Sequence, residues 1–329
     1  MFADTVLAER PWSNSKIEAL DKCPRSYCLK YRDKLKGAQS GAAARIGTTV
    51  HAVFEYGLRS EMPDEALILS GAEPNAPMAV AVPSHTDREL DERLPYLLGL
   101  FAKSPRNKLT PPEYEEATSL LPRAKSFVLG MQDLAGAKGI DEFFLEHKTA
   151  IGVDYELQPF DVEKETAPGV FTRVSNSDAL IRGVVDFGFI ANGVYVVIDH
   201  KTGKVKKLDD YADQLRLYML FALAEHPDVE GVQCGINHVR RPKVDWCPPR
   251  AKHEIEREVK PWLGHHLNRL DIKLRMIDGG QRRAKISPLC NWCDFVDGPG
   301  LCPEGFAEVT ANPRGPRLLL PVVQASSEV

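Results

Sequence analysis

The chain has 329 residues, of which 43% are hydrophobic, and a formal net charge of −4. The length favours one enlarged domain or two modest ones, and the charge excludes a uniformly basic nucleic-acid-binding surface while allowing a local basic groove. No apolar run approaches membrane-spanning length and no leader-like segment opens the chain, so we expect a cytoplasmic protein without membrane contact.

The first 60 residues predict two helices. Residues 13–31 form a capped apolar pattern that starts at Ser13 or Asn14 and is divided or kinked at Pro24. A small-residue stretch over 41–47 precedes a second helix over 48–59, which carries His51. Residues 61–139 then change to Pro-containing loops and amphipathic helices over 87–102 and 112–134, which indicates a helical insertion or lid.

Strand-like segments follow at 143–150, 179–190 and 194–198, and residues 191–193 form the turn between the last two. A helix over 208–226, a strand over 232–239 and a long charged helix over 252–277 complete the pattern. We therefore expect N-terminal helices (1–60), a helical insertion (61–139), a mixed α/β catalytic core (140–280), a cysteine-rich loop (281–311) and a mobile tail (312–329).

Two acids and a lysine suggest the chemistry. Asp186 lies in one strand, and Asp199 and Lys201 alternate on the next, so both of the latter point to one side and His200 to the other. Two carboxylates can share Mg²⁺ or Mn²⁺, with the His200 backbone carbonyl as a further oxygen ligand. The Lys201 amine can orient a metal-bound water or accept its proton, which favours phosphodiester hydrolysis. Taken without the upstream acid, an Asp-x-Lys triplet is more often an exposed ion pair than part of an active site.

Further polar residues fit the same site. His51 precedes the sheet on a helix and is a candidate metal ligand, although a lone helical His is usually structural. Gln214 and Tyr218 are four residues apart and share one face of a helix.

The seven cysteines are unevenly spaced, with a tight C-terminal group: Cys23, Cys28, Cys234, Cys247, Cys290, Cys293 and Cys302. Clustered cysteines in a reducing compartment bind metal more often than they form disulfides. The C-terminal group supplies three thiolates, and a fourth must come from elsewhere. Four thiolates suit either a 4Fe–4S cluster or tetrahedral zinc.

In its ordered motifs the sequence resembles the PD-(D/E)XK nuclease superfamily, specifically its RecB-like branch with an iron-sulfur cluster (AddB-type and CRISPR-associated RecB-like exonucleases). The motifs are Cys23-Pro24 with Tyr27 and Tyr31, Gly47 to His51, Gly183 to Asp186, Asp199 to Gly203, and Gln214 to Tyr218. The resemblance spans about residues 13–302 and leaves 61–139 unmatched.

The resemblance implies a restriction-endonuclease-like mixed sheet flanked by helices, with a helical insertion and a C-terminal iron-sulfur loop. It implies Asp186, Asp199 and His51 as metal ligands and Lys201 as the catalytic lysine, while Gln214 and Tyr218 would position DNA or water. Asp199 replaces the glutamate that is commoner at that position in the superfamily.

It also implies Cys23 as the fourth ligand beside Cys290, Cys293 and Cys302, and favours a 4Fe–4S cluster over zinc as a structural clasp. Cys28 is close enough in sequence to replace Cys23, whereas Cys234 and Cys247 are interpreted as buried or incidental thiols.

We therefore expect a prokaryotic or phage-encoded, Mg²⁺- or Mn²⁺-dependent DNA exonuclease. It would act on single-stranded DNA or DNA ends in recombination, repair or replication, alongside a separate helicase or recombinase, because this chain lacks a phosphate-binding motor motif. The alternative is a non-catalytic DNA-binding or recombination scaffold that keeps the fold.

Overall fold

The computed structural model describes residues 2–35, 41–71, 78–167, 169–241, 243–293, 295–296 and 301–312. The chain divides into two compact units, one of residues 41–265 and one that joins residues 1–40 to 266–329. The tail expected over 312–329 lies outside the described residues after Asn312. The expected insertion (61–139) and most of the expected catalytic core lie together in the first of these units.

Unit 41–265 is built on a mixed sheet of eight strands in the order β1-β2-β6-β7-β8-β10, with β3 beside β2 and β9 beside β8. Only β7 and β8 pair in parallel; the other described pairs are antiparallel. The strands are β1 (Ala79–Ala81), β2 (Glu142–Ile151), β3 (Leu157–Gln158), β6 (Ile181–Ala191), β7 (Val194–Lys201), β8 (Gly231–His238), β9 (Val244–Trp246) and β10 (Arg250–Ala251). The sheet is the expected mixed one.

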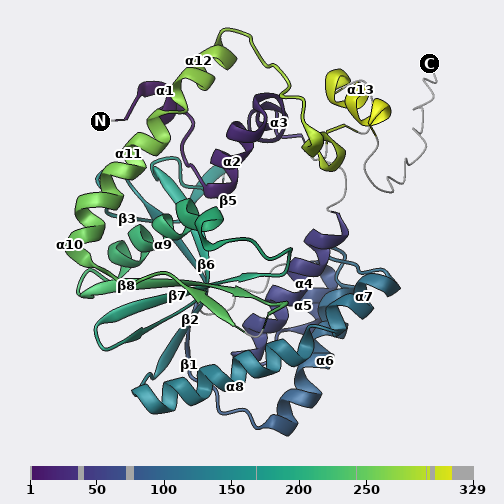
Figure 1. The fold of residues 1–329 in the computed structure, drawn as a ribbon, viewed down its shortest axis with the longest axis vertical. Helices are drawn as coiled ribbons and strands as arrows, with labels where there is room; N and C mark the ends of the chain where they lie inside the picture. Colours follow the sequence, from purple (N-terminus) through teal and green to yellow (C-terminus); the bar gives the residue numbers. More distant parts are fainter. Residues whose placement is uncertain are drawn as a thin grey trace. The chain divides into compact units, whose positions relative to one another are not determined.

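Helices cover both faces of this sheet (Figure 1). On one face lie α4 (Ala42–Gly57), α6 (Asp87–Lys103) and α8 (Leu121–Lys138), whose apolar side chains share a single core with β2, β6 and β7. The rings of Phe54, Phe127 and Phe187 pack together in this core, with centroids 5.5 Å apart in each adjacent pair. Because this core is shared, the segment 61–139 is a layer of the fold and not a detached lid.

The other face is covered by α9 (Ala212–Glu225), which follows a short 3₁₀ turn over Leu208–Tyr211 (Figure 1). The helix lies close to the backbone of β6, because a Cβ at Gly183 would stand 2.6 Å from a ring carbon of Phe221. The remaining helices of this unit are α5 (Glu65–Ser70), α7 (Pro111–Thr118), α10 (Lys252–Glu254), a π-helical turn (Ile255–Val259) and α11 (Lys260–Asn268), which ends beyond the unit.

Three local features differ from or refine the sequence prediction. Helix α4 begins at Ala42, six residues before the expected start, because the alanines of the small-residue stretch before it have high helix propensity. The long helix expected over 252–277 is interrupted between Asn268 and Asp271. The turn between β6 and β7 has positive φ at Asn192 (49°) and Gly193 (73°), as a two-residue type I′ hairpin requires.

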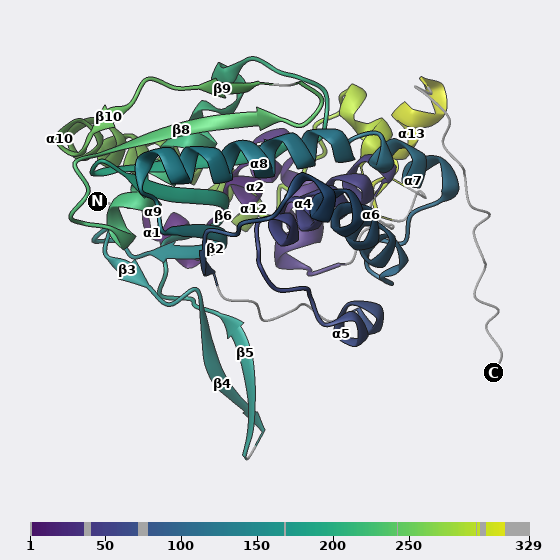
Figure 2. The same ribbon diagram turned by 90° about the horizontal axis from the view of Figure 1, so that it is seen from below.

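A second small sheet was not predicted. Strands β4 (Asp161–Ala167) and β5 (Val170–Ser175) form a hairpin that projects from the main sheet (Figure 2). Most of its side chains are exposed on both faces, so its sequence lacks the apolar alternation that reveals a half-buried strand.

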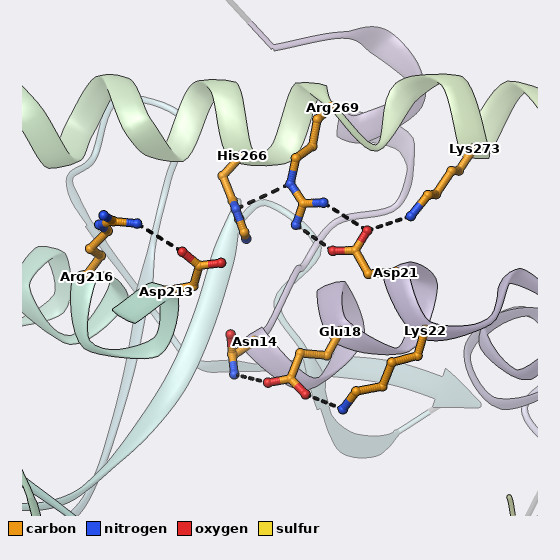
Figure 3. Close-up of polar contacts among 9 residues, drawn as sticks. All are labelled: Asn14, Glu18, Asp21, Lys22, Asp213, Arg216, His266, Arg269 and Lys273. Carbon is orange, nitrogen blue, oxygen red and sulfur yellow. Dashed lines mark hydrogen bonds and ion pairs between the residues drawn. The ribbon is translucent and has the colours of Figure 1, made fainter. Parts of the chain in front are cut away.

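The second unit joins the two ends of the chain. It contains α1 (Asp4–Ala8), α2 (Asn14–Lys22), α3 (Pro24–Tyr27), a π-helical turn (Cys28–Arg32), α12 (Asp271–Asp278), a 3₁₀ turn (Pro288–Trp292) and α13 (Pro303–Ala311). Ser13 caps α2 by accepting the Lys16 N–H, as expected. The Asp21 carboxylate of α2 binds Arg269 at 2.5 Å and Lys273 at 2.7 Å, which ties the two ends together (Figure 3).

Candidate functional site

The candidate active site lies where β6 and β7 separate. Toward this end the last paired residues of the two strands are Phe187 and Ile198, so the next rung would place Asp186 opposite Asp199. Instead of a ladder bond, the His200 N–H donates to Asp186 Oδ2 at 2.8 Å. The strands therefore open at the rung that carries the two predicted aspartates.

Glu146 of β2 belongs to the same rung. In the β2–β6 register Leu145 pairs with Phe187 and His147 with Val185, which leaves Glu146 opposite Asp186 without a ladder pair. Glu146 also has a φ of 45°, a left-handed conformation that is uncommon for a side-chain-bearing residue and recurs at functional sites. Glu146, Asp186 and Asp199 thus occupy one rung of three neighbouring strands, which we call the acid rung.

Burial and mutual repulsion disfavour the ionised forms of two acids of the acid rung, Glu146 and Asp186. Burial, followed by repulsion from Asp186 and Glu55, raises the pKa of Glu146 to about 9. Burial and the neighbouring Asp199 raise the pKa of Asp186 to about 6, against the opposing effect of His51 and Lys201. Like charges on facing strands are unfavourable, so a divalent cation would let these acids ionise together.

His51 completes a group that could hold a metal. Its Nδ1 lies 3.5 Å from Asp186 Oδ2. In the described part of the chain, one ligand atom each from His51, Glu146 and Asp186 lie within 4.8 Å of one another. Carboxylate oxygens suit Mg²⁺ and Mn²⁺, and an imidazole nitrogen is compatible with the softer Mn²⁺.

The approach of α4 to the end of β7 places His51 here. A Cβ at Gly47 would stand only 3.0 Å from Thr202 Oγ1, so a glycine on α4 permits this close contact. One turn further along the helix, the His51 ring faces the acid rung.

Asp199 is engaged by protein groups on both oxygens. Lys201 Nζ lies 2.5 Å from Oδ2, while Gln214 Nε2 and the Tyr218 hydroxyl donate to Oδ1 at 2.9 and 2.7 Å. Asp199 is 1% exposed and does not belong to the group within 4.8 Å. Its role as a metal ligand therefore stays a prediction.

Lys201, Gln214 and Tyr218 all converge on Asp199, so the structure brings the predicted catalytic residues together. Burial alone would lower the pKa of Lys201, but Asp199 and Asp186 raise it above its usual value, which keeps the amine protonated. Gln214 also donates to the Tyr218 hydroxyl at 2.7 Å. The i,i+4 pair on α9 thereby fixes the orientation of the Asp199 carboxylate.

The His200 side chain points to the other side of the sheet, as the period-two pattern predicted. Its ring packs 4.5 Å from Phe54 and 4.9 Å from Phe127, centroid to centroid, and its Nδ1 lies 2.9 Å from Asn237 Nδ2. Burial lowers its pKa well below the usual value. The use of its backbone carbonyl as a metal ligand stays a prediction.

Glu146 is the residue that the sequence analysis missed. Its signal was available: it is the single acid within the apolar start of the strand expected over 143–150. An acid at such a position either faces solvent or enters a site, and only the register with Asp186 distinguishes the two.

The cysteine site lies in the second unit. Cys23 joins α2 to α3, Cys290 and Cys293 lie in and after the 3₁₀ turn, and Cys302 precedes α13. A Cβ at Gly305 would stand 3.0 Å from Cys302 Sγ and 3.8 Å from Cys290 Sγ, so these two sulfurs flank the same glycine. Burial raises the pKa of Cys293 and of Cys302, and Cys23 contributes to both shifts.

Cys28 is placed differently. It is 1% exposed, and burial raises its pKa, with smaller effects from Arg282, Arg32, Asp33 and Glu9. Cys23, in contrast, contributes to the pKa shifts of Cys293 and Cys302. The ligand assignment itself stays a prediction.

Sequence comparison identifies the class of protein. The profile of the PD-(D/E)XK nuclease superfamily matches residues 11–298. The chain therefore belongs to the PD-(D/E)XK nuclease superfamily, whose members are hydrolytic nucleases that use divalent metals.

No curated protein sequence matches the chain. Among solved structures, that of a "putative exonuclease" from Eubacterium rectale is similar with a TM-score of 0.38 and 11% identity, over 88% of this chain and 89% of that one. No helix in the described residues is both long enough and apolar enough to span a membrane.

Proposed function

We propose that this nuclease is a Mg²⁺- or Mn²⁺-dependent exodeoxyribonuclease of the RecB-like branch. The observation that carries the proposal is the acid rung with His51 on one side and Lys201 on the other. Glu146 and Asp186 are partly buried and have raised pKa values, so a cation between them would favour their ionised forms, and the Lys201 amine would supply a further positive charge.

The residues divide the work. His51, Glu146 and Asp186 would hold the cation, which supplies an activated water and charge stabilisation at the scissile phosphate. Lys201 would orient the attacking water and offset negative charge that develops on the phosphoryl oxygens. Gln214 and Tyr218 hold Asp199 in place, and Asp199 in turn holds Lys201. This arrangement supports hydrolysis over a scaffold that only binds DNA.

The substrate we propose is single-stranded DNA or DNA with free ends, cut during recombination, repair or replication. A helicase or recombinase would be a separate partner. These finer statements rest on the motif resemblance to RecB-like exonucleases.

The test incubates the purified protein with labelled linear and circular single-stranded DNA, duplex DNA and RNA, each with Mg²⁺, Mn²⁺ or EDTA. Metal-dependent loss of linear DNA, absent in Lys201→Ala, is the expected result. Equal cutting of circular and linear strands would replace the exonuclease with an endonuclease. Binding without cleavage in every metal would support the scaffold alternative.

We further propose that Cys23, Cys290, Cys293 and Cys302 bind a 4Fe–4S cluster that clasps the two ends of the chain. Thiolates around tetrahedral zinc lie about 3.8 Å apart, because each is about 2.3 Å from the ion. The preference for a cluster over zinc rests on the motif resemblance, and metal and sulfide analysis can distinguish the two.

This proposal is tested by anaerobic purification with iron, sulfide and zinc analysis and visible absorbance. Cys23→Ser should lose iron and colour, while Cys28→Ser serves as the matched control and should retain both. Retention of iron in Cys23→Ser with loss in Cys28→Ser would move the ligand role to Cys28. Stoichiometric zinc without sulfide would replace the cluster.

A further inference from the structure

A cavity of about 370 Å³ lies beside the acid rung in unit 41–265. It is bounded by the start of α4, by α7, by the loop after β7 and by the turn after β8, and its lining includes Ala43, Ile46, Thr202 and Lys204. The volume is within the usual range for small-ligand sites. Apart from Thr202, whose hydroxyl meets α4 at Gly47, none of these lining residues has a role in the site described above.

The cavity stands at a short, fixed distance from the catalytic residues. Thr202 follows Lys201 directly in the chain, and Ile46 and Ala43 precede His51 on α4 by five and eight residues. At 1.5 Å per residue the helix separates them by about 7 to 12 Å along its axis. A ligand in the cavity would therefore be a close neighbour of the scissile phosphate.

Arg240 gives the cavity a positioned cation. Its Nε donates to the Thr202 carbonyl oxygen at 2.8 Å, which orients the guanidinium, and a terminal nitrogen binds the Glu116 carboxylate of α7. The side chains of Arg240 and Glu116 are 40% and 44% exposed, so another anion can reach the guanidinium. Lys204 adds a second positive charge, while Ala43 and Ile46 form an apolar wall.

We propose that this cavity is a subsite for a DNA nucleotide next to the scissile phosphate. The phosphate of this nucleotide binds Arg240 and Lys204, and its sugar packs against Ala43 and Ile46. In the free protein the Glu116 carboxylate binds the Arg240 guanidinium in place of that phosphate. A guanidinium pairs with phosphate and carboxylate through the same N–H donors, so one oxyanion can replace the other. This inference rests on the proposed DNA substrate.

The test measures binding of a fluorescent single-stranded oligonucleotide by anisotropy, in EDTA, across a salt series. Arg240→Gln is compared with Arg241→Gln, which removes the same charge from a neighbouring side chain that pairs with Asp245 at 3.8 Å and does not line the cavity. Arg240→Gln should weaken binding by about tenfold, the size of one charge-assisted contact. It should also reduce the slope of log K against log salt by about 0.7, whereas Arg241→Gln should change both less.

Glu116→Gln provides an independent variant with the opposite expectation. Removal of the competing carboxylate should tighten DNA binding several-fold, while Glu115→Gln, its exposed neighbour on α7, should not. Thermal melting of each variant checks that the fold is intact.

The outcomes separate the two proposals. If the wild-type protein binds and cuts DNA but Arg240→Gln matches Arg241→Gln, or Glu116→Gln matches Glu115→Gln, the subsite is wrong and the nuclease function stands. If the wild-type protein neither binds nor cuts DNA, the proposed substrate fails and the subsite with it.

Discussion

The acid rung and the cysteine site are built in different ways. The acid rung takes residues from neighbouring strands, so strand alternation and register set where its side chains point. The cysteine site takes Cys23 and Cys302 from opposite ends of the chain, each directly before a proline that starts a helix. The residues of a site on adjacent strands can be predicted from the local alternation of side chains. The residues of a site made from both ends of the chain can be predicted only from their type, here cysteine.

The two sites nevertheless share a physical property. Burial raises the pKa of Glu146 and Asp186 in one and of Cys293 and Cys302 in the other. At both sites the binding of a cation would favour the ionised forms of these side chains. Metal loading at either site should therefore release protons. If both sites bind metal as proposed, they should differ in the effect of metal loss: DNA cleavage should stop when the acid rung loses its cation, and the free energy of unfolding should fall when the cysteine site loses its metal.

The largest effect is expected for Lys201→Ala. Loss of the amine removes the charge beside the cation and the scissile phosphate, so the cleavage rate should fall by about 10³-fold or more. The protein should stay folded, and any metal bound at the cysteines should be retained. Rates from single-turnover cleavage, with the melting curve as control, measure this. Activity near the wild-type level would remove Lys201 from the mechanism.

Cys293→Ser should have the opposite profile. If the four cysteines bind metal as proposed, loss of one thiolate should release it and lower the free energy of unfolding by several kcal/mol, because metal binding at such sites contributes to folding. The control Cys247→Ser changes a half-buried thiol of the other unit and should have little effect. Chemical denaturation measures the free energy of unfolding of both variants, and elemental analysis measures their metal content. Unchanged stability after metal loss would show that the ion pairs of Asp21 suffice as the clasp.

Glu146→Gln tests the acid that sequence reasoning missed. If Glu146 holds the cation, Mn²⁺ affinity should fall by about 10- to 100-fold, with a matching loss of activity at low metal concentration. Calorimetric titration measures the affinity. The control Glu142→Gln alters an exposed acid at the start of the same strand and should not change it.

The metal-free protein should lose stability as the pH rises. Glu146 and Asp186 have folded-state pKa values of about 9 and about 6, above their ordinary values, so the folded state binds more protons than the unfolded state between roughly pH 4 and pH 9. The melting temperature in EDTA should therefore fall across this range, and Mg²⁺ should oppose the fall. Glu146→Gln should flatten the curve above pH 6; an unaltered curve would contradict the assignment.

The smallest effect on stability is expected for the ion pairs of Asp21 in the second unit. Asp21→Ala removes contacts to Arg269 and Lys273 and should cost about 1 kcal/mol, since the pair is partly shielded from solvent. Glu18→Ala breaks contacts to Asn14 and Lys22 on the exposed side of α2 and should cost less than about 0.5 kcal/mol (Figure 3). Equal losses measured by denaturation would contradict the bridging role of Asp21.

Much of the fold followed from periodicity. The main strands β2, β6, β7 and β8 and helix α9 lie within a few residues of their predicted bounds, because each carries a long apolar run that the fold buries, on both faces in β7 and β8 and on most sides of α9. The β4–β5 hairpin was missed because its side chains stay exposed. The early start of α4 was missed because small residues show no apolar helical periodicity, so the stretch over 41–47 was placed before the helix.

The candidate site was partly predictable. Asp186, Asp199 and Lys201 could be placed together, because alternation and a two-residue turn fix their neighbours. Glu146 could not, because its place depends on the register of a strand 40 residues upstream and on a left-handed backbone conformation. The sequence pattern predicts well which face of a strand is buried. It does not predict the register between two strands that pair in the sheet but lie far apart in the sequence, such as β2 and β6.

The missing side chain at Gly183 sets how far α9 stands from the sheet. Gln214, Tyr218 and Phe221 share one stripe of that helix, and a Cβ at position 183 would stand 2.6 Å from the Phe221 ring. A methyl group at position 183 would force the Phe221 ring to shift, on the helix whose Gln214 and Tyr218 donate to Asp199. The absence of a side chain on β6 is therefore part of what lets α9 bring these two donors to the acid rung.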